Sequence, residues 1–122
     1  MEEFSVKDKM RIIQELVPGR QITLSHVIAN PDETLYQKLG LDPKNNYRRS
    51  AIGIVTVSPA ETAVICADIA MKASGSMVEF VDRFTGTLII TGTVSECETA
   101  VNAVCTYSRD TLGYSCTPIT KT

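Results

Sequence analysis

The chain has 122 residues, 43% of them hydrophobic, and a formal net charge of −2. This size fits one domain near the lower limit for a self-sufficient core, so contacts between copies would add buried surface. Scattered Lys and Arg argue against a nucleic-acid partner, and no apolar run approaches the ~20 residues that cross a bilayer. The first nine residues lack the apolar core of a signal peptide, so we expect a cytoplasmic protein with no membrane partner.

Residues 10–17 are the first candidate element, and their pattern is ambiguous. Met10, Ile13, Leu16 and Val17 fit a helical stripe, which the following Pro18-Gly19 turn would end. The pattern alone favours a helix.

β-Branched, alternating runs predict strands at residues 22–29, 51–58, 77–81 and 87–94, with a weaker strand at 114–121. The short turn at residues 83–86 would join the third and fourth runs as a hairpin. Residues 42–49 are polar and rich in turn formers, so we expect a surface loop there.

Three helices are predicted by the same capping motif, an Asn or Ser at the N-cap followed three residues later by Glu. The pairs are Asn30 with Glu33, Ser58 with Glu61 and Ser95 with Glu98. With Pro31 and Pro59 at first helical positions, and Gly40, Gly75 and Gly113 as left-handed C-terminal residues, the helices span residues 31–39, 59–74 and 96–112. The predicted order along the chain is thus strand, helix, strand, helix, strand, strand, helix, strand. This order predicts an α+β fold, a mixed sheet with helices on one side.

The middle helix carries a predicted apolar stripe made mostly of alanine, which would let it lie close to a sheet. Its members are Ala60, Ala63, Val64, Ala67, Ala70 and Met71. Asp68 and Lys72, four residues apart, could form an intrahelical pair worth only ~0.3–0.5 kcal/mol.

No residue pattern predicts catalysis or a metal site. His26 is the single histidine, and a structural, hydrogen-bonded role is favoured for it. Cys66, Cys97, Cys105 and Cys116 have none of the short spacings that hold zinc or iron, so we expect reduced, packed thiols. No phosphate-binding glycine loop occurs, and no cofactor is implied.

The chain nevertheless resembles a known family in several blocks. Residues 51–74 read AIGIVTVSPAETAVICADIAMKAS and resemble the opening motif of bacterial microcompartment shell proteins, whereas residues 25–33, SHVIANPDE, resemble their closing motif. The closing motif comes first here, which is similar to the circularly permuted shell proteins of propanediol- and ethanolamine-utilisation compartments. Residues 14–26 and 80–86 carry further marks, and the resemblance runs from residue 12 to 120.

The resemblance implies a structural shell subunit without catalytic activity, with a ferredoxin-like sheet. Such proteins form flat cyclic hexamers that tile a shell around an enzyme pathway in the cytoplasm. The implied partners are copies of the chain itself, other shell proteins and encapsulated enzymes. The implied organisation is an N-terminal extension at residues 1–19, disordered at first and then a pore-capping strand, followed by a permuted shell domain at residues 20–122.

The resemblance also implies site residues. Those expected to line the central pore are Asp82, Arg83, Phe84, Thr85 and Gly86. Those expected to form a strand that assembles with five copies into a pore-capping barrel are Ile12, Ile13, Gln14, Glu15, Leu16 and Val17. Lys72 matches the lysine at the hexamer edge, while Asn30 stands where unpermuted members usually carry arginine, so we expect weaker side-by-side tiling.

Two rival functions remain open at this level. One is a redox shell variant that binds iron or zinc through Cys97, Cys105 or Cys116 of different protomers, motivated by four cysteines in a short chain. The other is a dimeric, ligand-binding regulatory domain of ferredoxin-like topology, which shares the order of strands and helices.

Overall fold

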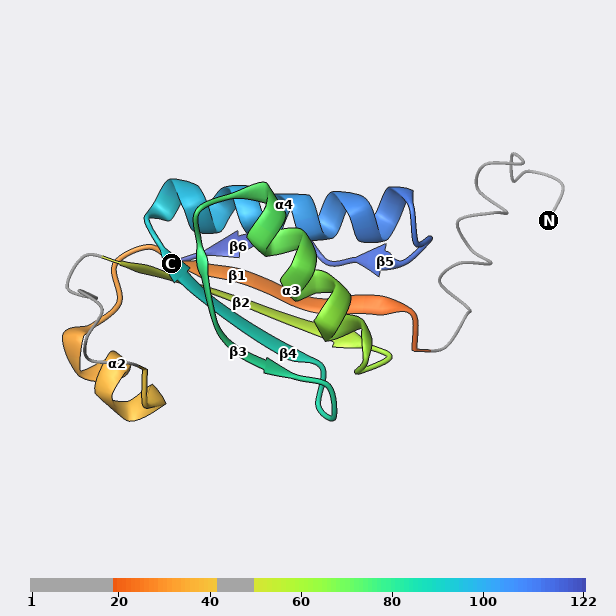
Figure 1. Cartoon of the computed structure of the whole chain (residues 1–122). Helices are drawn as coiled ribbons and strands as arrows, with labels where there is room; N and C mark the ends of the chain where they lie inside the picture. The colour runs from red at the N-terminus through yellow and green to blue at the C-terminus, as the bar shows by residue number, and fades with distance from the viewer. Residues whose placement is uncertain (1–18, 42–49) are drawn as a thin grey trace, which may run out of the picture.

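The computed structural model describes residues 19–41 and 50–122. Within them the elements are β1 (Gln21–Ile28), α2 (Glu33–Leu39), β2 (Ala51–Ser58), α3 (Thr62–Ala73), β3 (Met77–Asp82), β4 (Thr87–Gly92), α4 (Val94–Asp110), β5 (Ser115–Cys116) and β6 (Thr120–Lys121). Figure 1 shows the sheet lying beneath α3 and α4. The predicted order is confirmed, except that the weak last strand is split in two. Pro118, which has no N–H for a ladder, lies between the two halves.

One mixed sheet contains all the described strands, in the order β3-β4-β2-β1-β5, with β6 also paired to β1. β1 runs antiparallel to β2 but parallel to β5 and β6. β3 and β4 form the predicted antiparallel hairpin. The first described strand therefore lies in the middle of the sheet, and β3 lies at its edge.

The main core lies between the sheet and the two long helices. Alternate residues of β2, among them Val55 and Val57, point to this face together with Leu88 and Ile90 of β4. The helices meet them mostly with small side chains: Ala63, Cys66, Ala67 and Ala70 from α3, and Cys97, Ala100, Val101, Val104 and Cys105 from α4. Short side chains allow the helix axes to approach the sheet closely.

The predicted stripe on α3 is correct for Ala63, Ala67 and Ala70 but wrong for two of its largest members. Val64 and Met71 are 53% and 60% exposed, whereas Cys66 is fully buried. Steps of three and four residues fit two adjacent faces of this helix, and the face with the smaller side chains packs on the sheet. The larger apolar residues are left on the outer surface.

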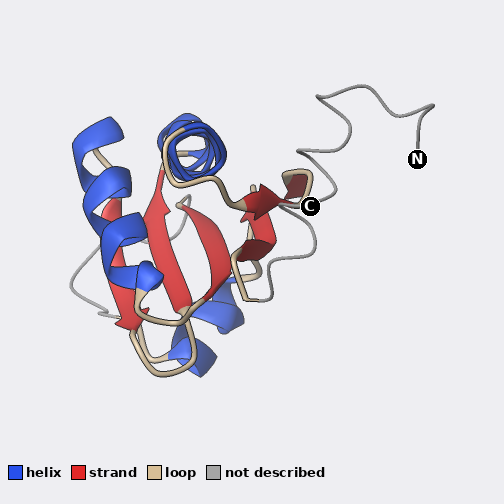
Figure 2. Ribbon diagram, turned by 90° about the vertical axis from the view of Figure 1, so that its right-hand side faces the viewer, coloured by secondary structure: helices blue, strands red, loops and turns tan. Residues whose placement is uncertain are grey.

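α2 departs from the expectation that all helices lie on one side. The expectation holds for α3 and α4, but α2 packs against the opposite face of the sheet (Figure 2). There Tyr36 and Ile52 form a small second core with Ile28, Leu35, Leu41, Ile54 and Ile89 around them. The Tyr36 hydroxyl donates to the Ser50 carbonyl.

All three predicted N-caps are wrong by a few residues. α2 is capped by Asp32, whose carboxylate accepts from the Thr34 amide at 2.9 Å, and not by Asn30. Ser58 ends β2, paired with Gln21, so α3 starts only at Thr62 and its N-cap has no side-chain hydrogen bond. α4 has a true capping box, but it consists of Thr93 and Glu96, two residues before the predicted pair.

The predicted C-terminal glycines are confirmed at Gly40 and Gly113, with φ of 69° and 73°, and wrong at Gly75. Gly75 is not among the residues with positive φ. A Cβ there would lie 2.3 Å from Oε2 of Glu96, the carboxylate that closes the capping box of α4. Space, and not backbone handedness, explains this glycine.

The division into an extension at residues 1–19 and a domain at 20–122 stays a prediction, because residues 1–18 lie outside the described part. The same holds for the choice between helix and strand at residues 10–17 and for the surface loop at 42–49. In the described residues, no helix has the length and apolarity needed to span a membrane.

Candidate functional site

The turn between β3 and β4 is tightly organised around one carboxylate. Asp82 Oδ1 accepts from the Phe84 amide at 2.8 Å, and Oδ2 accepts from the Thr85 hydroxyl at 2.7 Å. The Thr85 hydroxyl and then the Phe84 amide lower the pKa of Asp82, because both bonds favour the charged form. The Gly86 amide donates to the Asp82 carbonyl at 2.9 Å and closes the turn.

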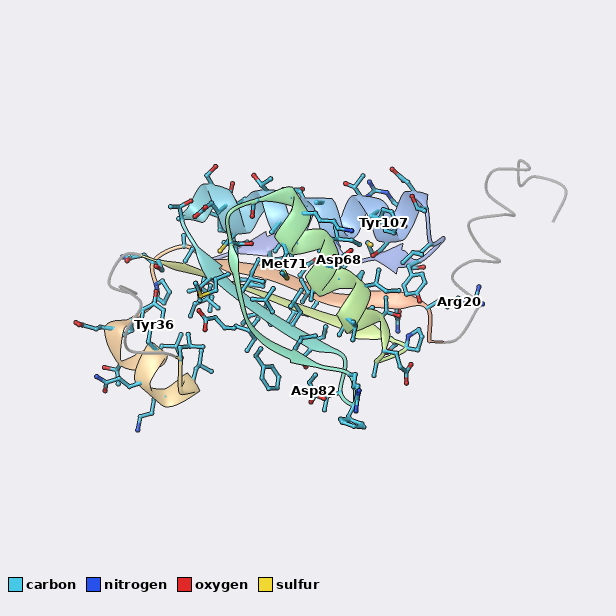
Figure 3. The ribbon with its side chains drawn as sticks, viewed as in Figure 1. Arg20, Tyr36, Asp68, Met71, Asp82 and Tyr107 are labelled. Atoms are coloured by element: carbon cyan, nitrogen blue, oxygen red, sulfur yellow. The ribbon has the colours of Figure 1, made fainter. Side chains whose placement is uncertain are left out.

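The far side of this turn is anchored to the body of the domain at Gly86. Its φ is 80°, and a Cβ there would lie 2.1 Å from the Val57 carbonyl oxygen. The Gly86 carbonyl accepts from the Val57 amide at 2.8 Å. The turn is therefore a fixed projection at one end of the sheet, where Figure 3 labels Asp82.

The tip of the turn presents an aromatic and a cationic side chain to the outside. Phe84 is 81% exposed, and the Arg83 guanidinium carbon lies 5.2 Å from the centre of its ring. This distance is within the range of a cation–π contact. The five predicted pore residues are thus brought together in one turn that other molecules can reach.

The outer surface of α3 carries the second predicted site residue, Lys72. Its Nζ lies 2.8 Å from Oδ2 of Asp68, which confirms the predicted intrahelical pair. The hydrogen bond and charge of Asp68 raise the pKa of Lys72. Between α3 and α4 lies a hollow of about 350 Å³, which Ile65, Ile69, Ala73 and Tyr107 line together with this pair. Figure 3 shows Asp68 and Met71 on α3 and Tyr107 on α4.

Asn30 lies exposed in the bend between β1 and α2, two residues before the true cap of that helix. It belongs to a different part of the fold from Lys72 on α3. The predicted barrel residues Ile12, Ile13, Gln14, Glu15, Leu16 and Val17 lie outside the described residues.

His26 has the structural role that its sequence context predicts. Its Nδ1 lies 2.6 Å from the Thr120 hydroxyl and its Nε2 lies 2.9 Å from the Thr122 hydroxyl. Both ring nitrogens are therefore used to hold the segment around β6 against β1. The Ala29 amide, which donates to the Thr122 carbonyl at 2.8 Å, adds to this attachment.

The four cysteines are free thiols, as predicted, and Cys66, Cys97 and Cys105 are buried. Burial is the main cause that raises the pKa of Cys66 to about 12, and of Cys97 and Cys116 to about 11. Among the described residues, no group of three His, Cys, Asp or Glu side chains is placed to hold a metal ion.

Sequence reasoning missed the apolar residues that the fold leaves outside. On α3 they are Val64, Ile65 and Met71, and on the edge strand β3 they are Met77, Phe80 and Val81, each more than 40% exposed. Val81 pairs with Leu88, a main-core residue, so it lies on the same face of the sheet as α3. An apolar surface beside an open strand edge is typical of an interface.

Comparison with known proteins matches this geometry to one family. Residues 51–118 match the model of the BMC domain. The chain is 49% identical over 111 residues to the bacterial microcompartment shell protein CutR of Streptococcus intermedius, covering 91% of each chain. It is 44% identical over 112 residues to the shell protein PduU of Salmonella typhimurium, covering 92% of this chain and 93% of that protein.

Solved structures give the same result. A structure of the CutR flat hexamer superposes with a TM-score of 0.80 at 46% identity, covering 89% of this chain and 96% of that one. Because the match covers 89% of this chain, the likeness extends over most of the fold. The chain belongs to the BMC domain family of bacterial microcompartment shell proteins.

Proposed function

We propose that this chain is a structural shell subunit that assembles as a cyclic homohexamer in the shell of a bacterial microcompartment, with the β3–β4 turn edging the six-fold axis. The observation that carries the proposal is the fixed, exposed turn from Asp82 to Gly86 on an edge hairpin. A relative of nearly the same length, 46% identical, is solved as a flat hexamer, which supports the same assembly here.

The circular permutation is part of this proposal. The family model begins at residue 51, the first residue of β2, and leaves out β1. Yet β1 lies between β2 and β5 within the same sheet. A strand that is central in space but outside the matched range fits a family strand moved from the end of the domain to its start.

The subunit contacts that close the ring are proposed to include the edge of β3 and the outward face of α3. Among the described strands, β3 has a neighbour on one side only, and its Val81 is more than 40% exposed, as are Val64 and Met71 on α3. Burial of apolar surface contributes about 25 cal/mol per Å², so a second copy on this face would stabilise both the edge and the small domain.

Contacts between neighbouring hexamers are proposed to run through Lys72 and the region of Asn30. Lys72 is already paired with Asp68, and Asn30 carries no charge at the position where the family resemblance implies an arginine in unpermuted members. The protein alone should therefore form extended sheets poorly and depend on other shell proteins as partners. Regular sheets of the pure protein in electron micrographs would contradict this part of the proposal.

Residues 12–17 are proposed to cap the axis, with Ile12, Ile13, Leu16 and Val17 burying one another across six copies. Four apolar residues per chain would be costly to leave in water. Deleting residues 1–17 should leave a hexamer with an open axis. Loss of the hexamer in this truncated protein would show that the segment holds the ring together instead.

A catalytic or metal-binding role is not favoured. The charged residues that line the hollow beside Tyr107 are Asp68 and Lys72, which pair with each other and are both solvent-exposed. This lining does not hold a nucleophile next to a general base. The redox alternative needs thiolates, whereas Cys97 donates into the core, its Sγ 3.6 Å from the Ala51 carbonyl. Iron analysis of anaerobically purified protein should find no stoichiometric metal.

The deciding experiment is the mass of the assembly in solution by light scattering. We expect six times the mass of one chain at micromolar concentration. A stable monomer would contradict the shell proposal, and a stable dimer that binds a metabolite would support the rival regulatory domain.

A further inference from the structure

Three of the four thiols gather at one place in the main core, between α3, α4 and β5. This thiol cluster consists of Cys66, Cys105 and Cys116, because both Cys105 and Cys116 lie close enough to Cys66 to influence its thiol. Cys105 lies in the last turns of α4, and Cys116 follows in β5 after the chain reverses at Gly113. The Cys116 Sγ lies 3.4 Å from the Cys105 carbonyl oxygen, so the two residues are in direct contact.

The members of the thiol cluster differ in how easily a small molecule reaches them. Cys66 is fully buried and Cys105 is 4% exposed, while Cys116 is only partly buried. The nearby Cys105 thiol is, after burial, the next cause that raises the pKa of Cys116, and it also raises that of Cys66. Cys116 is therefore the point of entry, and Cys105 is the thiol beside it.

We propose that Cys105 and Cys116 form a reversible intrachain disulfide under peroxide, so that the shell domain carries a redox-modifiable link between α4 and β5. The attacking species is the thiolate form of Cys116, a small fraction because the pKa of this thiol is raised. It attacks one oxygen of hydrogen peroxide and gives a sulfenic acid and hydroxide, which takes up a proton to become water. The Cys105 thiolate then attacks the Cys116 sulfur and expels hydroxide, which leaves as water. Overall, two thiols and one peroxide give one disulfide and two waters, and a dithiol reductant reverses the link.

The link fits the local architecture. Cys105 and Cys116 close a short loop that already folds back on itself, since the Tyr114 amide donates to the Ser108 carbonyl at 2.9 Å. The two thiols are also within hydrogen-bonding distance of each other, so cross-linking them asks for little backbone movement. Cys97 lies in the first turns of α4 with its own acceptor on Ala51, so it serves as an internal control.

The experiment maps disulfides in the assembled wild-type protein after treatment with hydrogen peroxide and blocking of free thiols. Trypsin cuts after Arg83 and Arg109, which separates Cys116 from a peptide that holds Cys97 and Cys105. We expect these two peptides to become linked with the loss of two hydrogens. The protein should still run as a single chain on a non-reducing gel.

Two variants assign the bond. The C97S variant should keep the link, which then has one cysteine on each side, and C116S should lose it. A linked peptide in C97S assigns Cys105 even if a C105S variant fails to fold. The proposal is overturned if the wild type shows no link, if Cys116 ends as a sulfinic acid instead, or if the dominant bond involves Cys66, Cys97 or a second chain.

Discussion

Gly86 joins two constraints that usually occur separately. Its backbone is left-handed, and the space where a side chain would stand is already filled by the Val57 carbonyl. Gly40 has a similar φ, but nothing lies within 4 Å of the position of its Cβ. Comparing Gly86 with Gly40 therefore separates two free-energy costs of adding a side chain, that of a left-handed backbone and that of a steric clash.

Replacing Gly86 with alanine should destabilise the domain more than the same change at Gly40. G40A should cost about 1–2 kcal/mol, the penalty of a left-handed alanine. G86A should cost roughly 1–3 kcal/mol more, because strand β2 or the turn must move. The measurement is the denaturant midpoint of each variant. Equal midpoints would mean that the turn can move away from the Val57 carbonyl at no cost in stability.

The turn should also give the domain a pH-dependent component of stability through Asp82. Its pKa is lowered on folding, so the stabilisation is fully present above the ordinary aspartate pKa and is lost as pH falls through the folded value. The window lies below about pH 4. D82N should melt earlier than the wild type at neutral pH. Thermal melts from neutral to acidic pH should show this difference shrinking, and a constant difference would assign it to shape, not charge.

At the scale of elements, the N-terminus of α4 offers a direct test of which residues cap it. Thr93 and Glu96 exchange two bonds, Glu96 N to Thr93 Oγ1 at 3.1 Å and Thr93 N to Glu96 Oε1 at 2.9 Å. T93A should destabilise the protein by about 1 kcal/mol. S95A, at the position that the sequence favours, should change stability by less than about 0.5 kcal/mol. Chemical denaturation of both variants decides the matter, and the reverse ranking would restore the sequence-based cap.

The strands, and their order along the chain, could be predicted because the alternation of apolar and polar residues indicates which side chains face a core. The caps could not, since Thr93 and Ser95 each precede a Glu by three residues and local sequence does not choose between them. Ser58 does not cap α3, because its pairing with Gln21 in the sheet keeps it extended. α2 has apolar residues enough to pack on either face of the sheet, and only the tertiary fold placed it opposite α3.

The candidate site divides in the same way. The turn at Asp82 could be placed from its short, polar hairpin sequence and from the family resemblance. The exposed apolar residues could not be predicted, because burial in the chain's own core and burial against another chain favour the same hydrophobic side chains. The sequence pattern therefore predicts Val64 and Met71 in the chain's own core, whereas they lie on its surface.

At the scale of the whole molecule, this surface should hold the assembly together. V81D places a charge on the apolar face beside α3, where desolvation by a second copy would be costly. We expect light scattering to show a shift from hexamer toward monomer. Q37D, on the exposed side of α2, is the matched control and should leave the mass unchanged. A V81D protein that stays hexameric would place the subunit contact elsewhere.

The central position of β1 also bears on how this protein is made. His26 leaves the ribosome before its two bonding partners, Thr120 in β6 and Thr122 just after it, which are separated from it by 94 and 96 residues. During synthesis β1 can pair with β2 as soon as residue 58 has emerged, whereas the other edge of β1 stays unpaired until residues 115–121 follow. Contacts of such long sequence separation form slowly, and an open strand edge invites pairing with other nascent chains. The yield of correctly folded chains would thus depend on how soon residues 120–122 reach β1 and close this part of the sheet.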